Sequence, residues 1–328
     1  MKVVCLALLA LVPFIGSAHT QSALAQDAGW KPTRNTEIVV GNGAGGEIDR
    51  IARAVQRAAQ VEHLTDANIS VVNKPGTGQM IAVAYMNAHA GDGHYISILN
   101  RSWIAVQASK NTRAYQDVTP IEKAFSAYQI FAVNPDSPIK NPKDIIAKLK
   151  QDVSSVSFTF VARGGSEHAS AVKLAELAGA DPKKLKIVIF DNASKAALAV
   201  AGGHVDVYIS SVGTAMPLIQ GGKMRAIGIG APERLKGPMA SVPTLREQGV
   251  DLLSQQAYFF CGPKGMTKAQ VAFWQDLLAK ALQSDDVQKE ALNESWVTDL
   301  QGSDQLGPWL AQTYDEVKAA QVAAGYEN

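Results

Sequence analysis

Short strand-like runs alternate with segments of helical periodicity along almost the whole sequence, and this alternation limits the fold more than any other feature. Between the runs, apolar residues recur at the helical spacing, as at Ile48, Ile51 and Val55. Strands separated by helices in this way are typical of α/β layers with largely parallel sheets. The strand-like runs are 37–40, 69–73, 95–99, 129–134, 155–161, 186–190, 205–209 and 224–230.

Polar residues mark the starts of several expected helices. Asn141 precedes Pro142, which suits a first helical turn, and Asn192 stands where it can cap the next helix. Thr267 and Gln270 have the spacing of a capping box. The helix that follows them carries an apolar stripe that includes Trp274, which we interpret as core.

Two extended apolar segments flanked by Pro and Gly lie near residues 125–133 and 252–263. If both are strands that cross between two lobes, the middle of the chain forms one lobe and its two ends form the other. We therefore expect domain 1 to comprise residues 26–125 together with 254–328, and domain 2 to comprise 126–253. A chain of this length can build two such cores.

The first 25 residues have the three parts of a secretory signal peptide. Lys2 is the basic start, residues 3–15 form an apolar core too short to span a membrane, and Ala23-Leu24-Ala25 is a small-residue cleavage site. We expect cleavage after Ala25 and export to the periplasm.

The exported chain would keep one cysteine and no net charge. Cys261 alone cannot form an internal disulfide, and it follows two aromatic residues in an apolar run, so we expect it to be buried. Loss of Lys2 leaves 30 Lys and Arg against 30 Asp and Glu. This balance argues against nucleic acid or an anionic membrane as the main partner.

A glycine-rich turn, Gly41-Asn42-Gly43-Ala44-Gly45-Gly46, follows the first strand and satisfies the dinucleotide pattern G-x-G-x-x-G. An NAD(P)-dependent oxidoreductase is therefore one alternative. The second strand, however, ends in Asn73-Lys74-Pro75 without the acidic residue that binds ribose, so we expect no cofactor. Backbone N–H groups at a helix start still suit a small anion. Glu47 would repel that anion unless it binds a donor on the ligand.

Several motifs in the same order resemble one known family. They are Val40 to Asp49, the N-x-P-G-x-G pattern of Asn73 to Gly78, and the later segments "FAVNPDSPIKNPKDIIAKLK", "GGSEHASAVKLAELAGAD" and "AVAGGHVDVYIS". The chain resembles the extracytoplasmic solute receptors of tripartite tricarboxylate transporters, also called the Bug family. The resemblance covers nearly the whole exported chain.

The resemblance implies a bilobal periplasmic-binding-protein type II fold, with two α/β domains joined by two crossing strands. It also implies a monomer that binds a small organic carboxylate between its lobes and delivers it to membrane permease subunits. A carboxylate-sensing partner of a signalling system is a second alternative. The implied ligand-binding residues are Asn42, Gly43, Gly45, Gly46, Glu47, Thr77 and Gly78 in domain 1, and Gly164, Gly165, Ser166, His168, Asp191 and Ser210 in domain 2.

Three departures from the family pattern favour a ligand other than an ordinary tricarboxylate. Gly41 and Asn42 replace a proline and an aromatic residue, Asp191 replaces a usual lysine, and Ser210-Ser211 replaces a usual aspartate. The pocket is therefore expected to be more hydrogen-bonding and less basic than is usual.

Other chemistry finds little support. Ser166, His168 and Asp191 could be drawn as a hydrolase triad, but the sequence lacks the G-x-S-x-G elbow, so we expect no enzyme. His89, Asp92 and His94 lack metal-ligand spacing, and we interpret them as solvated loop residues without a metal. Arg101 and Arg163 follow strand ends where a base would line a cleft, although an arginine without a motif more often lies on an exposed face.

Overall fold

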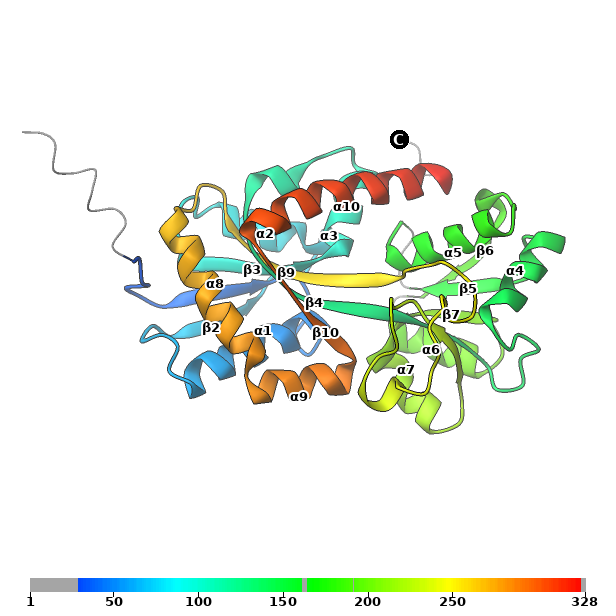
Figure 1. Cartoon of the computed structure of the whole chain (residues 1–328). Helices are drawn as coiled ribbons and strands as arrows, with labels where there is room; N and C mark the ends of the chain where they lie inside the picture. The colour runs from blue at the N-terminus through cyan, green and yellow to red at the C-terminus, as the bar shows by residue number, and fades with distance from the viewer. Residues whose placement is uncertain (1–28, 161–163, 191, 326–328) are drawn as a thin grey trace, which may run out of the picture.

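Two α/β lobes lie side by side and are joined by two long strands. The computed structural model describes residues 29–160, 164–190 and 192–325. Strands β4 (Val118–Val133) and β9 (Gln255–Pro263) run antiparallel to each other and cross from one lobe toward the other (Figure 1). The architecture is the bilobal fold that the resemblance implies.

The sheet of the first lobe combines a parallel part with an antiparallel part. Strand β1 (Thr36–Val40) pairs in parallel with β2 (Ile69–Asn73) on one side and β3 (Tyr95–Asn100) on the other. Strand β3 continues antiparallel into β9, and β9 into β4. A further strand, β10 (Trp296–Gly302), pairs antiparallel with β4. The central strand β1 is buried along most of its length because helices cover both faces of the sheet.

The helices of the first lobe bury apolar stripes against this sheet. They are α1 (Glu47–Val61), η1 (Thr77–Gln79), α2 (Met80–Asn87), α3 (Arg101–Ser109), α8 (Lys268–Gln283), α9 (Asp285–Glu294) and α10 (Ser303–Ala323), with the short turn η2 (Ala114–Asp117) before β4. In α1, Ile48, Ile51 and Val55 are buried, as their spacing predicts. Trp274 of α8 is fully buried, and its indole N–H donates to the Gly93 carbonyl at 2.8 Å.

The sheet of the second lobe also combines parallel strands with antiparallel ones. Strand β5 (Ser157–Phe160) lies between β6 (Lys186–Ile189) and β7 (Val207–Ser211), and all three are parallel. Strands β7 and β8 (Arg225–Ile229) both pair antiparallel with the last part of β4. The helices are α4 (Pro142–Gln151), α5 (Ser166–Leu177), α6 (Ala193–Ala201) and α7 (Val212–Gln220), and the short turns are η3 (Pro182–Lys184) and η4 (Gly237–Met239).

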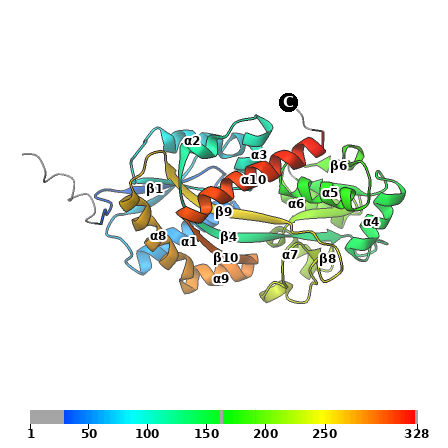
Figure 2. The ribbon, with the colours of Figure 1, turned by 45° about the horizontal axis from the view of Figure 1, so that its top comes forward.

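Each lobe has its own apolar core. Two clusters of buried side chains draw only on residues within 38–127 and 258–317, and two others only on residues within 130–252. Helix α10 begins on the first lobe and extends toward the second (Figure 2). There the side-chain amide of Gln321 donates to the carbonyls of Ala105 in α3, at 2.9 Å, and Gly164 before α5, at 3.2 Å.

Most predicted elements are confirmed. Asn141 and Thr267 form capping boxes, Asn192 caps α6, and Cys261 is fully buried. The strand predicted from Val205 begins at Val207. Strand β10 was not predicted, because its sequence has no clear alternation and its pairing with β4 is interrupted by a register shift between Thr298 and Gln301. Among the described residues, no helix is both long enough and apolar enough to cross a membrane.

Candidate functional site

The loop between β1 and α1 is held in place by the carboxylate of Asp49. The Gly45 N–H donates to Asp49 Oδ2 at 2.8 Å, and Arg53 Nε donates to the same oxygen at 2.8 Å. Although burial opposes ionisation, the hydrogen bonds from Arg53, Gly45 and Asn73 lower the pKa of Asp49. In this conformation an internal carboxylate therefore already accepts one of the N–H groups that could bind an external anion.

The same loop packs against the turn before α2. A Cβ on Gly41 would lie 2.5 Å from the Gln79 side chain, so only glycine fits there. The Asn73 amide donates to the Asn42 carbonyl at 3.0 Å. The exposed residues Asn42, Gly43 and Gly45 thus lie on the same lobe and beside the turn that holds Thr77 and Gly78, which are also exposed.

Glu47, the first residue of α1, points toward the crossing strands. Its Oε1 accepts from the Trp296 indole N–H at 2.6 Å, and the Tyr258 hydroxyl also donates to it. Burial raises the pKa of Glu47, and the hydrogen bonds from Tyr258 and Trp296 only partly oppose this effect. Glu47 therefore has partners on its own lobe in β9 and β10.

In the second lobe, the loop before α5 is fastened by His168. The Gly164 N–H donates to His168 Nδ1 at 3.0 Å, and the imidazole is buried beside the Phe160 ring. Ser166 Oγ accepts from the Gln129 amide of β4 at 2.8 Å. Among these predicted residues, His168 has a role in holding the loop, and Ser166, beside Gly165 at the start of α5, contacts the crossing strand.

A second glutamate begins α5. Ser166 Oγ donates to Glu167 Oε2 at 3.2 Å. Burial raises the pKa of Glu167, and the carboxylate of Glu47 raises it further. The first turns of α1 and α5, from different lobes, thus place two half-buried carboxyl groups near enough to repel each other. An anion bound directly between these two helix starts would meet the same repulsion.

The last two predicted ligand-binding residues are Ser210 and Asp191. Ser210 is buried in β7, where it pairs with Ile130 of β4. Asp191 lies outside the described residues.

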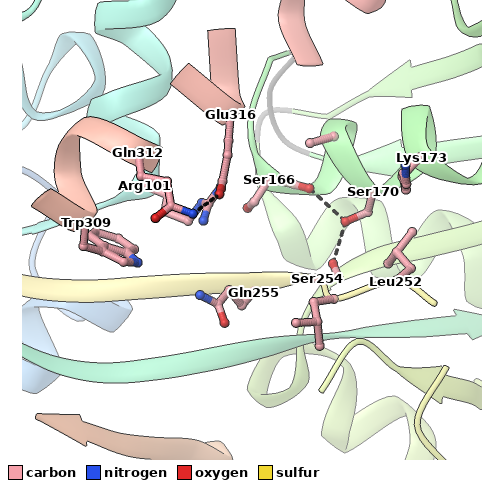
Figure 3. Close-up of a pocket in the computed structure, with 12 residues that line it drawn as sticks. Arg101, Ser166, Ser170, Lys173, Leu252, Ser254, Gln255, Trp309, Gln312 and Glu316 are labelled. Atoms are coloured by element: carbon pink, nitrogen blue, oxygen red, sulfur yellow. Dashed lines mark hydrogen bonds and ion pairs between the residues drawn. The ribbon is translucent and has the colours of Figure 1, made fainter. Parts of the chain in front are cut away.

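A cavity of about 390 Å³ opens between the lobes on the side of α10 (Figure 3). Helices α3 and α10 contribute Arg101, Trp309, Gln312 and Glu316 from one side. Ser166, Ser170 and Lys173 of α5 lie on the other side, and residues 252–255, which lead into β9, lie along the base. Among the predicted ligand-binding residues that the structure describes, only Ser166 lines this cavity.

Arg101 is mostly buried, which corrects the expectation of an exposed face. Only 15% of its side chain is accessible, because α10 covers it. Its Nη2 lies 3.6 Å from Glu316 Oε2, an ion pair longer than a hydrogen bond. Its Nε is buried and makes no hydrogen bond within the part of the chain that the structure describes. The sequence signal that marked Arg101 as a residue lining the cleft was its position directly after β3.

A buried polar cluster joins the lobes beneath the cavity. The hydroxyls of Ser170 and Ser254 lie 2.6 Å apart, and both donate to Gln129 Oε1. Gln129 belongs to β4 and Ser254 precedes β9, so the cluster ties α5 to both crossing segments at the junction of the lobes.

The histidines near residue 90 are not all solvated. His94 is buried, with its Nδ1 2.6 Å from Asp92 and its Nε2 accepting the Thr33 N–H at 3.2 Å. The His89 ring stacks on Tyr95 at a centroid distance of 3.7 Å. Among residues 29–160, 164–190 and 192–325, no group of three or more His, Cys, Asp or Glu could hold a metal ion.

Comparison with known proteins identifies the family. Residues 51–319 match the model of the "Tripartite tricarboxylate transporter family receptor", TctC. The chain belongs to this family. A TctC solute binding protein from Polaromonas has a similar structure, with a TM-score of 0.74 and 23% identity over 88% of this chain and 98% of that one.

Two further proteins are similar to this TctC-family receptor. A UPF0065 protein from Pseudomonas sp. strain P51 is 27% identical over 282 residues, which are 84% of this chain and 81% of that protein. MatC from Rhodopseudomonas palustris, with bound malate, has a TM-score of 0.71 and 21% identity over 88% of this chain and 99% of that one.

The family and the sheet order together remove the dinucleotide interpretation of the glycine loop. In a Rossmann sheet the strands beyond the neighbours of the first strand are also parallel, whereas here the strand beyond β3 is the antiparallel β9. Strand β2 ends at Asn73, which hydrogen-bonds Asp49, and Lys74 lies over the Tyr85 ring at 4.4 Å. The family is one of solute receptors rather than of enzymes.

Proposed function

We propose that this TctC-family receptor captures a small organic carboxylate between its two lobes and delivers it to the membrane permease subunits of a tripartite transporter. One observation carries the proposal. A cavity of about 390 Å³ opens between the two lobes, and it is lined by Ser166 at the start of α5, directly after a glycine-containing loop. The malate bound to MatC, a protein of the same fold, supports a carboxylate as the ligand class.

In this proposal, both facing loops contribute to the site. Asn42, Gly43, Gly45, Gly46 and Glu47 act together with Thr77 and Gly78 in the first lobe, and Gly164, Gly165, Ser166, His168, Asp191 and Ser210 act in the second. The exposure of Asn42, Thr77 and Gly78 supports direct contact with a ligand. The burial of His168 favours an indirect role through Gly164.

The wider organisation is proposed on the same basis. The signal peptide would be cleaved after Ala25, and the receptor would act as a periplasmic monomer. Domain 1 would comprise 26–125 and 254–328, and domain 2 would comprise 126–253; the separate apolar cores support this division.

A thermal-shift experiment tests the function. The exported chain is mixed with malate, succinate, adipate, citrate, NAD or NADP, and the melting temperature is measured. Because a ligand that binds only the folded state stabilises it, at least one organic acid should raise the melting temperature by an amount that grows with its concentration. A rise with NAD or NADP and with no organic acid would refute the proposal.

Gly45 tests the first loop. Its φ of +78° strains any side chain, but a Cβ there would meet no atom within 4 Å. Gly45→Ala is therefore strained by about 1–2 kcal/mol and Gly45→Asp by no more than that, because aspartate tolerates a positive φ better, and only the aspartate adds negative charge. If the loop contacts the ligand carboxylate, Gly45→Asp should lose the ligand-induced shift while Gly45→Ala keeps it. Equal shifts in both variants would remove this loop from the site.

A further inference from the structure

The acidic helix starts leave the proposed carboxylate without an evident positive partner at that point. Glu47 and Glu167 both lie there, and Gly45 already donates its N–H to Asp49. A carboxylate taken out of water requires a cation or several donors to offset its lost hydration. A ligand carboxylate between the lobes therefore needs a basic side chain whose hydrogen-bonding capacity is not used up.

Two cavities of similar size lie between the lobes, and they differ in the burial and pairing of their basic side chains. The one beside α9 and β10 measures about 370 Å³, and both of its basic residues are exposed to solvent: Lys236, and Arg234, whose Nε already lies 2.9 Å and 3.0 Å from the two carboxylate oxygens of Glu247. The one between α3, α5 and α10 contains Arg101, whose Nε has no hydrogen-bond partner among the described residues and whose Nη2 is 3.6 Å from Glu316.

The structure assigns the cavity between α3, α5 and α10 as a carboxylate-binding pocket, in which Arg101 is the cationic anchor and Glu316 is the internal carboxylate that the ligand displaces. This assignment rests on the proposed function and places the positive charge that the ligand needs. It moves the anchor away from the glycine loops to the first residue of α3.

The surroundings of Arg101 suit this role. Its backbone N–H donates to Gln256 Oε1 at 2.9 Å, which fixes the start of α3 against β9. A guanidinium presents its donors in one plane and can bind both oxygens of a carboxylate. Burial lowers the pKa of Arg101 and Glu316 opposes this effect, but an arginine stays protonated at neutral pH. A buried, incompletely paired guanidinium is costly, and a ligand carboxylate would relieve that cost.

Glu316 is suited to leave. Its side chain is 52% exposed, and its contact with Arg101 is too long for a hydrogen bond. Because Glu316 is solvated and the two groups are 3.6 Å apart, their contact contributes little to stability. Glu316 can therefore turn into solvent when a ligand carboxylate takes its place, while Arg101 remains covered.

The rest of the cavity indicates the kind of acid. Its volume of about 390 Å³ falls near the lower end of the range for small-molecule sites. Trp309, held between Phe259 and Lys123, gives one apolar wall, and Gln255 offers an amide. The Gln312 amide donates to Glu316 Oε1 at 3.0 Å, so it becomes available to a ligand only when Glu316 turns away. Lys173 supplies a second, exposed cation on the opposite lobe, where its Nζ lies 3.2 Å from Glu176 Oε2. This arrangement fits a short dicarboxylate or a carboxylate with a small apolar body.

Two substitutions test the assignment by calorimetric titration with malate, succinate and adipate. Arg101→Gln removes the charge and should weaken binding by about 10- to 100-fold, the loss expected for charge-assisted hydrogen bonds. Glu316→Gln removes the competing charge and should strengthen binding. A purely structural ion pair would not give opposite effects at its two ends. Because Arg101→Gln could also unfold, its melting temperature is measured alongside, and the exposed Glu316 provides an independent result.

The chain offers a matched control on the same helix. Arg113 and Asp315 form an exposed ion pair at 3.4 Å between the turn before β4 and α10, outside the cavity. Arg113→Gln and Asp315→Asn should leave the affinity unchanged. If an acid binds the wild type but its affinity is the same in the Arg101 and Glu316 variants, the pocket assignment is overturned and the proposed function stands. If no organic acid of the thermal-shift series, citrate included, binds the wild type, both are overturned.

Discussion

Glu122 shows how burial changes a single residue in a crossing strand. Its side chain lies in β4 with 5% of the residue exposed, beside Gln275 of α8. Burial raises the pKa of Glu122 to about 7, because the ionised form loses its hydration and the hydrogen bond with Gln275 offsets only part of that loss. The carboxyl group is therefore largely protonated in acidic solution.

This pKa predicts a pH dependence of the free energy of unfolding. The folded-state pKa lies above the unfolded value of 4.5, so the folded protein binds the proton more tightly. Protonated Glu122 therefore makes its full contribution to the free energy of unfolding below about pH 4.5. This contribution is lost as pH rises through about 7, and it amounts to at most about 3 kcal/mol. Glu122→Gln should be more stable than the wild type at pH 8, as measured by denaturant unfolding. An equal difference between the two proteins at pH 5 and pH 8 would contradict the pKa shift.

At this scale, sequence reasoning locates side chains better than it predicts their environment. The positions of Arg101 and Glu47, at the starts of helices, follow from the local pattern. Their partners do not, because Glu316 and Trp296 are more than 200 residues away in the chain. The burial of Arg101 depends on helix α10, which no local pattern near residue 101 reveals.

Helix starts were the most predictable elements, because their signals are local. In α8 the Gln270 N–H donates to Thr267 Oγ1 at 3.2 Å, and the Thr267 N–H donates to Gln270 Oε1 at 2.7 Å. Strand β10 shows the opposite case. Five of its seven residues pair with β4, a strand more than 150 residues earlier, and within the described part of the chain no other strand pairs with it.

The capping box of α8 makes a prediction for this element. Thr267→Ala removes the hydroxyl that accepts the Gln270 N–H, and it should lower the free energy of unfolding by about 1 kcal/mol. Thr267→Ser keeps the hydroxyl and should stay close to the wild type. Denaturant midpoints measured for the three proteins side by side check this ranking. A Thr267→Ser variant as unstable as Thr267→Ala would mean that the methyl group, not the cap, is what matters.

The whole molecule joins two separately cored lobes through β4 and β9, and helix α10 contacts both. Such an arrangement suits hinge closure around a ligand, because few covalent connections need to bend. The Gln129, Ser170 and Ser254 cluster at the junction lies beside the cavity that contains Arg101. The fold class could be read from the alternation of strands and helices. The cavity could not, because it is formed by segments brought together only by the folded chain.

The crystal structure of the exported chain with the organic acid that gives the largest thermal shift tests the central claim most directly. We predict electron density for the acid between the lobes, with a carboxylate against the Arg101 guanidinium and Glu316 turned away from it. An acid bound on the outer face of one lobe, away from both α3 and α5, would contradict the account.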